Sequence, residues 1–329
     1  MIHYLVTARH AYTIREFLTD WAPALGERLG VVTYEQLVAY QRLPLGTWVF
    51  TDLDRLPPAR MAIAERAWER LSRAPVAVRT LNGPGRTLDR LGLHQALARA
   101  GINDYRADRA SEPSDEYAFP VFLRKAGHLG ENIGPLLRSR AELDRALRHA
   151  ADVGADLDAM LIVEFRDASD GKGVYRKYGA WVVGERIVPN HIFFSEHWIV
   201  KYSHRGLAER EEEERYMEDN PHEAWLRSVC EIAGVDFGRV DYGISDGRPQ
   251  VWEINTNPRV LLPPDEFEEE HRPSRRRFAS RLREALEGLD SRPLGRFGVP
   301  FTLDSDTVTL LEQELEHEED LERRGIFVE

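Results

Sequence analysis

Residues 251–258 read VWEINTNP, a short run of strand-forming residues that ends at a proline. Glu253 and Asn255 are two positions apart, so in a strand their side chains point to the same face. A carboxylate and a carboxamide on one face offer the oxygen ligands that a hard cation such as Mg²⁺ prefers. A strand face that is simply exposed to water explains the same pattern, and the stretch alone leaves both interpretations open.

A second strand pattern, GRVDYGISD, precedes this stretch and is joined to it through the turn DGRP at 246–249. If the two strands pair across that turn, Asp241 can face the same side as Glu253 and Asn255. Carboxylates placed together repel each other unless a cation joins them. Because Mg²⁺ usually brings phosphate oxygens with it, the pattern predicts a magnesium and phosphate site on this hairpin.

Residues 238–258 resemble the metal-binding hairpin of the ATP-grasp superfamily, which includes D-alanine–D-alanine ligase, glutathione synthetase and the ribosomal-protein glutamate ligases. The resemblance implies that Asp241, Glu253 and Asn255 hold two Mg²⁺ ions and that Arg239 contacts the transferred phosphate. It extends over roughly 75–265 of this chain. It implies an ATP-dependent ligase that joins a carboxylate to an amine through an acylphosphate, with small-molecule or peptide substrates.

Two arginines stand where the family has lysines that contact ATP phosphates. FPVFLR at 119–124 resembles the family's Pro-Val-apolar-apolar-Lys strand and ends in Arg124, with Lys125 next to it as an alternative. LDRLGLHQALARAGI at 88–102 resembles the family's Asp-Lys helix, and Arg90 has the place of the lysine. Arginine keeps the positive charge but spreads it over a planar fork. We therefore expect phosphate contacts here, with plain surface charge as the alternative.

A glycine-spaced loop, KAGHLGENIG at 125–134, follows the strand that ends in Arg124, where the family has its flexible glycine lid. Backbone N–H groups of such a loop can cradle phosphates. It is not a Walker loop, because no G-K-[ST] follows. His128 and Gly130 are therefore candidate ATP contacts, although His128 can also be an ordinary loop residue.

MLIVEFR at 160–166 resembles the family's hinge strand and implies the adenine contacts. By that likeness Glu164 meets the adenine amino group, and the backbone of Phe165 and Arg166 reads the ring edge. A glutamate of an edge strand in water is the alternative. The acidic ribose-binding residue of the family has no match here; Asp170 is a candidate substitute, and Lys177 can reach phosphate or an acidic substrate.

Arg259 directly follows the motif proline, where many of the ligases have glycine. Because arginine can bind a carboxylate through two parallel hydrogen bonds, Arg259 is the best candidate for binding a substrate and for a part in catalysis. A surface arginine is the alternative. Lys201 and Trp198 in EHWIVKYSH are further candidates for the substrate cleft, although core aromatic residues beside an exposed lysine explain this stretch more simply.

Strand and helix patterns alternate at the start of the chain and continue as mixed α+β segments. Together with the resemblance, this implies an ATP-grasp fold of α/β and α+β class whose two lobes clasp ATP. We expect a small open α/β domain over 1–85, a small lobe with a linker helix over 86–185, a large lobe with the metal hairpin over 186–290 and a helical tail over 291–329.

Composition narrows the class of protein. The 329 residues have a net charge of −12, which argues against binding to nucleic acid or a membrane surface because phosphate attraction needs a basic surface. One cysteine, Cys230, excludes an internal disulfide and a cysteine metal cluster; its apolar helix is typical of the core. The N-terminus has no signal-like pattern, and apolar runs are short, so we expect a cytoplasmic protein.

Two other functions remain open from the sequence. A kinase of the same superfamily would phosphorylate a small molecule without an amine acceptor. A non-catalytic nucleotide-binding protein would use only the scaffold. The intact Asp241, Glu253 and Asn255 argue against the second alternative, since a protein released from catalysis need not keep them.

Overall fold

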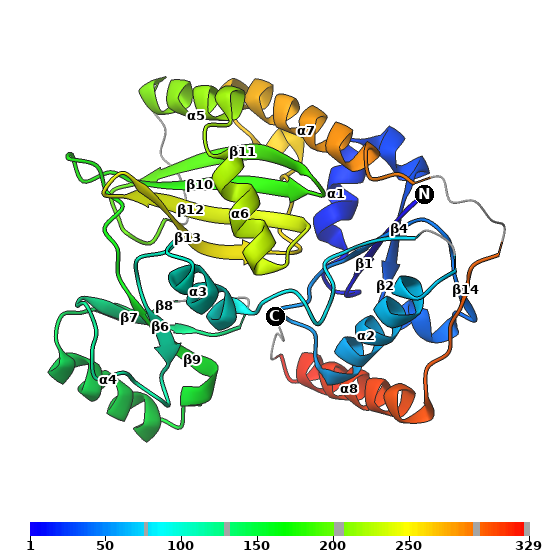
Figure 1. The fold of residues 1–329 in the computed structure, drawn as a ribbon, viewed down its shortest axis with the longest axis horizontal. Helices are drawn as coiled ribbons and strands as arrows, with labels where there is room; N and C mark the ends of the chain where they lie inside the picture. The colour runs from blue at the N-terminus through cyan, green and yellow to red at the C-terminus, as the bar shows by residue number, and fades with distance from the viewer. Residues whose placement is uncertain (76–77, 128–131, 201–206, 292–296, 326–329) are drawn as a thin grey trace.

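An open parallel sheet, with strand order β2-β1-β4-β5, begins the chain. The computed structural model describes residues 1–75, 78–127, 132–200, 207–291 and 297–325 (Figure 1). The strands of this first sheet are β1 (Ile2–Val6), β2 (Leu29–Thr33), β4 (Thr47–Phe50) and β5 (Arg79–Leu81). They are connected by α1 (Tyr12–Asp20), α2 (Pro58–Ser72), the 3₁₀ segments η1 (Pro23–Glu27) and η2 (Glu35–Ala39), and the short strand β3 (Arg42–Leu43). Every residue of β1 is buried, as expected for a parallel strand covered on both faces.

A smaller antiparallel sheet follows, with the order β6-β9-β7-β8. It consists of β6 (Ala107–Arg109), β7 (Val121–Lys125), β8 (Asn132–Leu137) and β9 (Met160–Glu164), with η3 (Leu157–Ala159) before the last strand. Helix α3 (Arg90–Arg99) leads into this sheet, and α4 (Arg140–Asp152) packs on it. Ser139 caps α4, and its hydroxyl accepts the N–H of Glu142.

The largest sheet is antiparallel and has the order β11-β10-β12-β13. It consists of β10 (Tyr175–Val183), β11 (Arg186–Ser195), β12 (Phe237–Ser245) and β13 (Arg248–Asn255). Helices α5 (Leu207–Asp219), α6 (Glu223–Ala233) and α7 (Arg272–Glu287) surround it, and η4 (Pro264–Glu266) and η5 (Glu269–His271) precede α7.

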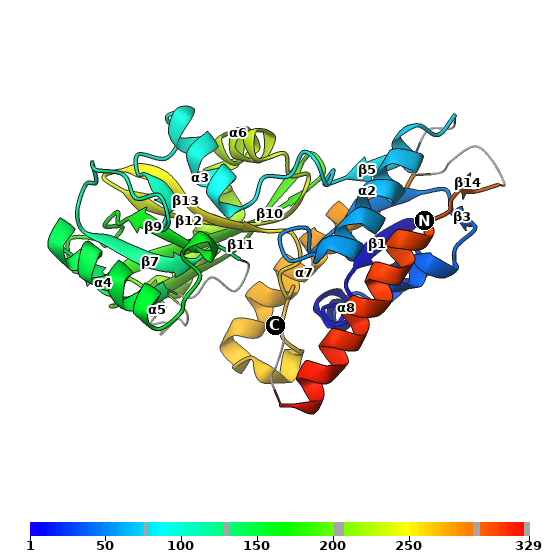
Figure 2. The ribbon, with the colours of Figure 1, turned by 90° about the horizontal axis from the view of Figure 1, so that it is seen from below.

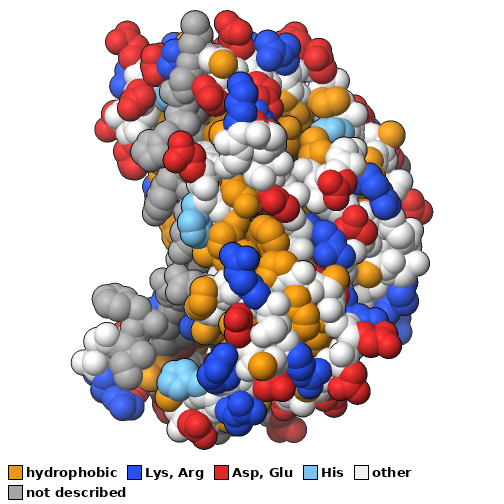
Figure 3. Space-filling model, turned by 90° about the vertical axis from the view of Figure 1, so that its left-hand side faces the viewer, with side chains coloured by type: hydrophobic (Ala, Val, Ile, Leu, Met, Phe, Trp, Pro, Cys, Tyr) orange, Lys and Arg blue, Asp and Glu red, His pale blue; other side chains and the backbone are white. Residues whose placement is uncertain are grey.

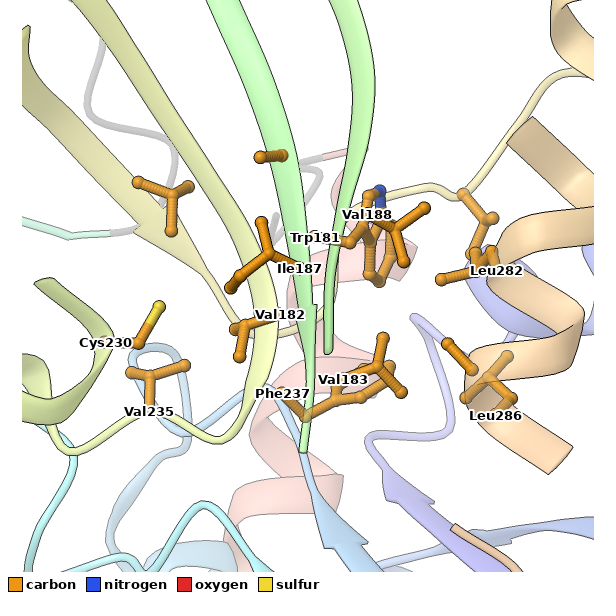
Figure 4. Close-up of a cluster of buried hydrophobic side chains, with 14 of the residues drawn as sticks. Trp181, Val182, Val183, Ile187, Val188, Cys230, Val235, Phe237, Leu282 and Leu286 are labelled. Atoms are coloured by element: carbon orange, nitrogen blue, oxygen red, sulfur yellow. The ribbon is translucent and has the colours of Figure 1, made fainter. Parts of the chain in front are cut away.

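The side chains of β10 alternate between the two faces of this sheet and contribute to the core on both. Trp181 and Val183 point toward Leu282 and Leu286 of α7, whereas Val182 points toward α6 (Figure 4). Cys230 of α6 lies on that second side and is buried, as the sequence predicted. Burial raises the pKa of the Cys230 thiol to about 12. The thiol is therefore a core group and not a nucleophile.

The boundary expected at residue 185 differs from the structure. β10 and β11 form an antiparallel hairpin in which Val183 pairs with Arg186, and β10 also pairs with β12. A boundary at 185 would cut this hairpin. β10 therefore belongs to the largest sheet, because its backbone hydrogen bonds lie there and not in the sheet of β9.

The C-terminal segment packs on the first domain and is not a separate tail. β14 (Val299–Pro300) pairs with β3, and α8 (Ser305–Arg323) lies along α2 (Figure 2). The guanidinium of Arg60 on α2 donates to Glu318 at 2.8 Å through each terminal nitrogen, and Glu35 accepts from its Nε at 2.5 Å. None of the described helices is long and apolar enough to cross a membrane.

Candidate active site

The two strands of the predicted metal hairpin, β12 and β13, pair as the sequence analysis required. Asp241 lies directly opposite Glu253, and Arg239 lies directly opposite Asn255. Residues that face each other across an antiparallel pair share one face of the sheet. The structure therefore brings two carboxylates, one carboxamide and one guanidinium together on a single face.

A β-bulge lies within this constellation. Asp241 pairs with Glu253, but its neighbour Tyr242 pairs with Val251, so Trp252 is the extra residue of β13. A bulge can turn an additional side chain toward a site, and both Trp252 and Glu253 line the same pocket. Gly243 makes room for the indole, since a Cβ there would lie 2.8 Å from Cζ2 of Trp252. The sequence analysis did not predict this bulge.

The Asp241 carboxylate is buried and held by two cations. Nε of Arg239 donates to Oδ1 at 2.6 Å and Nη2 donates to Oδ2 at 3.1 Å. Nζ of Lys177 on β10 lies 3.4 Å from Oδ2. Burial by itself would raise the pKa of Asp241, but the charges of Arg239 and Lys177 outweigh it and hold the pKa of this carboxyl well below its usual range.

Glu253 has its own pair of cations, and these come from distant parts of the chain. Nη1 of Arg90, the first residue of α3, lies 3.2 Å from Oε2 of Glu253, and Nη2 of Arg124 on β7 lies 3.5 Å from the same oxygen. Both arginines stand where the family resemblance implied phosphate-binding lysines. Four cationic side chains thus surround the two carboxylates, which leaves an excess of two positive charges in a protein whose net charge is −12.

The donor set fits a hard divalent cation. Asp241 and Glu253 offer charged oxygens from facing positions, and Asn255 offers a carboxamide oxygen beside them. Oδ1 of Asn255 also accepts the backbone N–H of Asn257 at 2.8 Å. These three side chains could therefore hold a metal ion together.

A pocket of about 310 Å³ opens beside Glu253 and is lined by both aromatic and charged side chains. The Trp198 ring lies 5.1 Å from Phe122 and 5.7 Å from Phe165, measured between ring centroids. Arg124 and Lys177 are among the charged residues of the lining. The residues that line it are His94, Tyr105, Phe122, Arg124, Asn132, Val163, Glu164, Phe165, Arg166, Lys177, Trp198, Ile199, Val200, Trp252 and Glu253. They come from both antiparallel sheets and the segments beside them, so the predicted cleft between 119–184 and the hairpin is present. One face of the molecule is hollowed, with apolar side chains gathered in its middle (Figure 3).

The three residues predicted to bind adenine all line this pocket, but much of their hydrogen bonding serves the fold. Oε1 of Glu164 accepts the N–H of Ala118 at 2.7 Å, and Oε2 accepts the N–H of Arg106 at 2.9 Å. The N–H of Phe165 donates to the carbonyl of Pro120 at 2.9 Å. Their contact with adenine stays a prediction, and it concerns chiefly the backbone around Arg166.

The side chain of Arg166 is held by Asp104. Its Nε donates to Oδ1 of Asp104 at 2.9 Å, and its Nη2 donates to the carbonyl of the same residue. The Arg166 side chain therefore holds the hinge strand against the segment after α3. A role in reading adenine would fall to its backbone.

Three other predicted residues are absent from the described lining of this pocket. Asp170 accepts Nη1 of Arg176 at 2.8 Å and two backbone N–H groups of its own turn, and that arginine lowers the pKa of the Asp170 carboxyl to about 2. Arg259 donates through Nε to Glu16 of α1 at 2.6 Å. Lys125 is exposed at the end of β7, since it follows Arg124 and points to the other face.

His128, Gly130 and Lys201 lie outside the described residues. Their predicted roles in binding phosphate and substrate stay predictions.

Tyr105 contacts the hairpin strand β13, His94 contacts Tyr105, and neither residue was predicted from the sequence. Tyr105 donates its hydroxyl proton to the carbonyl of Val251, so its oxygen accepts from Nδ1 of His94, 2.9 Å away. Burial lowers the pKa of His94 to about 3, which keeps the imidazole neutral. The spacing of Arg90 and His94 on one helix face was the only signal for this contact available in the sequence.

Comparisons with known proteins give low similarity over nearly the whole chain. No protein-family model matches the sequence, and no curated protein matches it. Among solved structures, D-alanine–D-alanine ligase from Bacillus anthracis is 13% identical with a TM-score of 0.48, covering 86% of this chain and 98% of its own. A RimK domain ATP-grasp protein from Sphaerobacter thermophilus is 14% identical with a TM-score of 0.47, covering 88% and 100%. A macrocyclase from Microcystis aeruginosa, bound with its precursor peptide, is 12% identical with a TM-score of 0.47, covering 87% and 100%.

The architecture itself supports the expected fold. A parallel α/β domain precedes two antiparallel sheets, and Trp252 and Glu253 of the hairpin line the pocket between those sheets. This order of sheets, with Asp241 facing Glu253, is the arrangement that the resemblance implied.

Proposed function

We propose that this protein is an ATP- and Mg²⁺-dependent ligase that joins a carboxylate to an amine and releases ADP and phosphate. One observation supports the proposal most directly. A pocket lined by aromatic and cationic side chains includes Glu253, which faces Asp241 across the hairpin. A purine base, a polyphosphate and a divalent cation need these three kinds of group.

The aromatic side chains of the pocket suit the adenine ring. Phe122, Phe165 and Trp198 present ring faces and edges to the pocket, and apolar walls with a few placed polar groups are typical of cofactor sites. The backbone around Arg166 would supply the polar groups at the ring edge. Specificity for adenine would then depend on main-chain hydrogen bonds.

The cationic side chains in and beside the pocket suit the phosphates. Arg90 and Arg124 now bind Glu253, and Lys177 binds Asp241. Phosphate oxygens entering between them would attract the three cations and free the carboxylates for Mg²⁺. Asp241, Glu253 and Asn255 would hold the metal, which supplies neutralisation of the charge on the polyphosphate.

The chemistry then takes two steps. A substrate carboxylate oxygen attacks the γ-phosphorus, the bond to the β-phosphate oxygen breaks, and ADP leaves. An amine next attacks the acyl carbon, the carbon–oxygen bond to phosphate breaks, phosphate leaves, and the amine nitrogen loses a proton. Arg239, beside Asp241 on the same face, would stabilise the charge that develops on the transferred group.

Isotope transfer tests the reaction directly. ADP release in the presence of amino acids and small carboxylates would first identify an accepted acid. With both oxygens of that acid labelled as ¹⁸O, and an amine present, the released phosphate should contain one ¹⁸O atom, because the acyl carbon–oxygen bond breaks. A kinase would leave the phosphoryl group on its product and release ADP without phosphate, and a non-catalytic protein would release no ADP. Either result would contradict the ligase.

A further inference from the structure

Asn257, the second carboxamide of the hairpin motif, is fully buried and has a partner for each side-chain polar atom. Its Oδ1 accepts the hydroxyl of Tyr4 at 2.7 Å and the hydroxyl of Thr13 at 2.7 Å. Its Nδ2 donates to Oδ1 of Asp52 at 2.9 Å. Two hydroxyl donors on one atom and a carboxylate acceptor on the other fix the orientation of this amide.

All three partners belong to the N-terminal domain. Tyr4 lies on β1, Thr13 on α1, and Asp52 just after β4. Asp52 is itself buried and has a φ of 59°, a strained conformation for a residue with a side chain. Its second oxygen accepts the N–H of Thr7 at 3.0 Å. Tyr4, Thr13 and Asp52 thus form a socket in the N-terminal domain that gives each polar atom of the Asn257 side chain a hydrogen-bond partner.

The backbone of Asn257 contacts a residue of the candidate metal site. Its N–H donates to Oδ1 of Asn255 at 2.8 Å. That bond sets the direction of the Asn255 carboxamide. A side chain fastened to the N-terminal domain therefore controls a group that faces the pair of Asp241 and Glu253.

We propose that Asn257 is a positioning residue through which the N-terminal domain orients Asn255 as a metal ligand. The inference rests on the proposed function, because it takes Asn255 as part of the metal site. Groups that orient metal ligands typically change metal affinity by about 10- to 100-fold when removed. Loosening the socket should therefore weaken metal binding, even though the altered residue is in another domain.

Two tyrosines provide a matched test. Tyr4 and Tyr34 are both fully buried in the N-terminal domain, and each donates its hydroxyl proton at 2.7 Å. Tyr4 donates to Asn257, whereas Tyr34 donates to the carbonyl of Thr51. Tyr4→Phe and Tyr34→Phe thus remove the same group from similar surroundings, and only Tyr4→Phe removes a hydrogen bond to Asn257 itself.

The affinity of the full chain for Mn²⁺ is measured with ADP present, and electron paramagnetic resonance detects the free and bound Mn²⁺. Tyr4→Phe should raise the Mn²⁺ Kd by about tenfold or more, while Tyr34→Phe should leave it unchanged at a similar loss of Tm. Thr13→Val, which removes the second donor to Asn257, should act like Tyr4→Phe. It serves as the test variant if Tyr4→Phe folds poorly.

The outcomes separate this inference from the proposed function. If the wild-type protein binds Mn²⁺ with ADP, but Tyr4→Phe and Thr13→Val bind it as well as Tyr34→Phe does, then Asn257 is only structural and the metal site stands. If the wild-type protein binds no Mn²⁺ with ADP, both the metal site and the role of Asn257 are wrong.

Discussion

Asp241 and Glu253 face each other across β12 and β13, and each carboxylate has its own pair of cations. Arg239 and Lys177 bind Asp241, while Arg90 and Arg124 bind Glu253. The negative charges of both carboxylates are therefore already paired with cations of the protein. A divalent cation arriving alone would have to displace these ion pairs, whereas a polyphosphate arriving with it would give the basic side chains new partners.

The first prediction is that nucleotide and metal bind cooperatively. Mn²⁺ should bind weakly alone and at least about tenfold more tightly with ADP, within the range usual for coupled sites. Linkage requires that Mn²⁺ tighten ADP binding by the same factor. Titrations of each ligand with and without the other check both halves. Tight Mn²⁺ binding without nucleotide would contradict the charge argument.

The second prediction concerns Glu253→Gln. The change keeps the shape of the side chain but removes one of two charged metal ligands, so Mg²⁺-dependent turnover should fall far more than stability. The Glu253 side chain is 31% exposed, but the side chains of Arg90 and Arg124 are only 9% and 12% exposed, so loss of the two ion pairs should cost on the order of 1–3 kcal/mol of folding free energy.

Glu212→Gln is the matched control for that variant. The Glu212 side chain is also 31% exposed and also binds an arginine, Arg176, at 2.7 Å, but it does not belong to the described lining of the pocket. Because the Arg176 side chain is 25% exposed, this variant should lower Tm slightly and keep normal turnover. Normal turnover of Glu253→Gln at saturating ATP and Mg²⁺ would disprove the metal assignment.

Local rules predicted the hairpin, and tertiary contacts decided the rest. The spacing of Glu253 and Asn255 and the turn at 246–249 were enough to predict which side chains share a face. The extra residue of the bulge, Trp252, packs against Tyr105, whose ring centroid lies 5.8 Å away, and no local pattern in the sequence shows this contact. Arg259 appeared free to bind a substrate, but Glu16, far away in the chain, occupies its guanidinium.

The third prediction is that Gly243→Ala weakens nucleotide binding. A Cβ at Gly243 would lie 2.8 Å from both Cζ2 and Nε1 of Trp252, so the indole must move. Overpacking of this kind costs about 1–3 kcal/mol. Because Trp252 lines the pocket, part of this cost should appear as a higher Kd for ADP in calorimetry.

Gly30→Ala provides the comparison, since a Cβ at this strand position would meet no heavy atom of the described residues within 4 Å. It should leave the Kd for ADP unchanged. If Gly243→Ala also left the Kd unchanged while lowering Tm, Trp252 would be a core residue without a part in binding.

The fourth prediction is a pH effect on stability from His94. Burial lowers its pKa to about 3 in the folded protein, against about 6.5 in an unfolded chain. Between these values the unfolded chain binds more protons, so stability falls as the pH decreases from about 6.5 toward 3. At pH 4.5 the loss from this group should be on the order of 2 kcal/mol relative to pH 7.

Urea unfolding of the wild type and of His94→Gln at pH 7 and pH 4.5 checks this effect. The stability advantage of the wild type should shrink at the lower pH, because only the wild type carries the buried imidazole. His149→Gln, at an exposed position of α4, is the control for replacing a histidine. An advantage of His94 that stays constant with pH would show that its folded-state pKa is close to the unfolded value.

The last prediction concerns Arg239, which binds Asp241 through two hydrogen bonds. If the guanidinium stabilises charge that develops during phosphoryl transfer, Arg239→Ala should lower kcat by at least about a hundredfold, the order seen when one preorganised donor is removed. The KM for ATP should change little. If Arg239 only holds Asp241 in place, the loss should instead appear in binding. Steady-state kinetics together with the Mn²⁺ Kd distinguish the two roles.

Arg239→Lys keeps the charge but loses the planar fork, so it should recover metal affinity without restoring the full kcat. A variant with weak binding of ATP and Mn²⁺ but normal kcat at saturation would show that Arg239 acts on Asp241 alone.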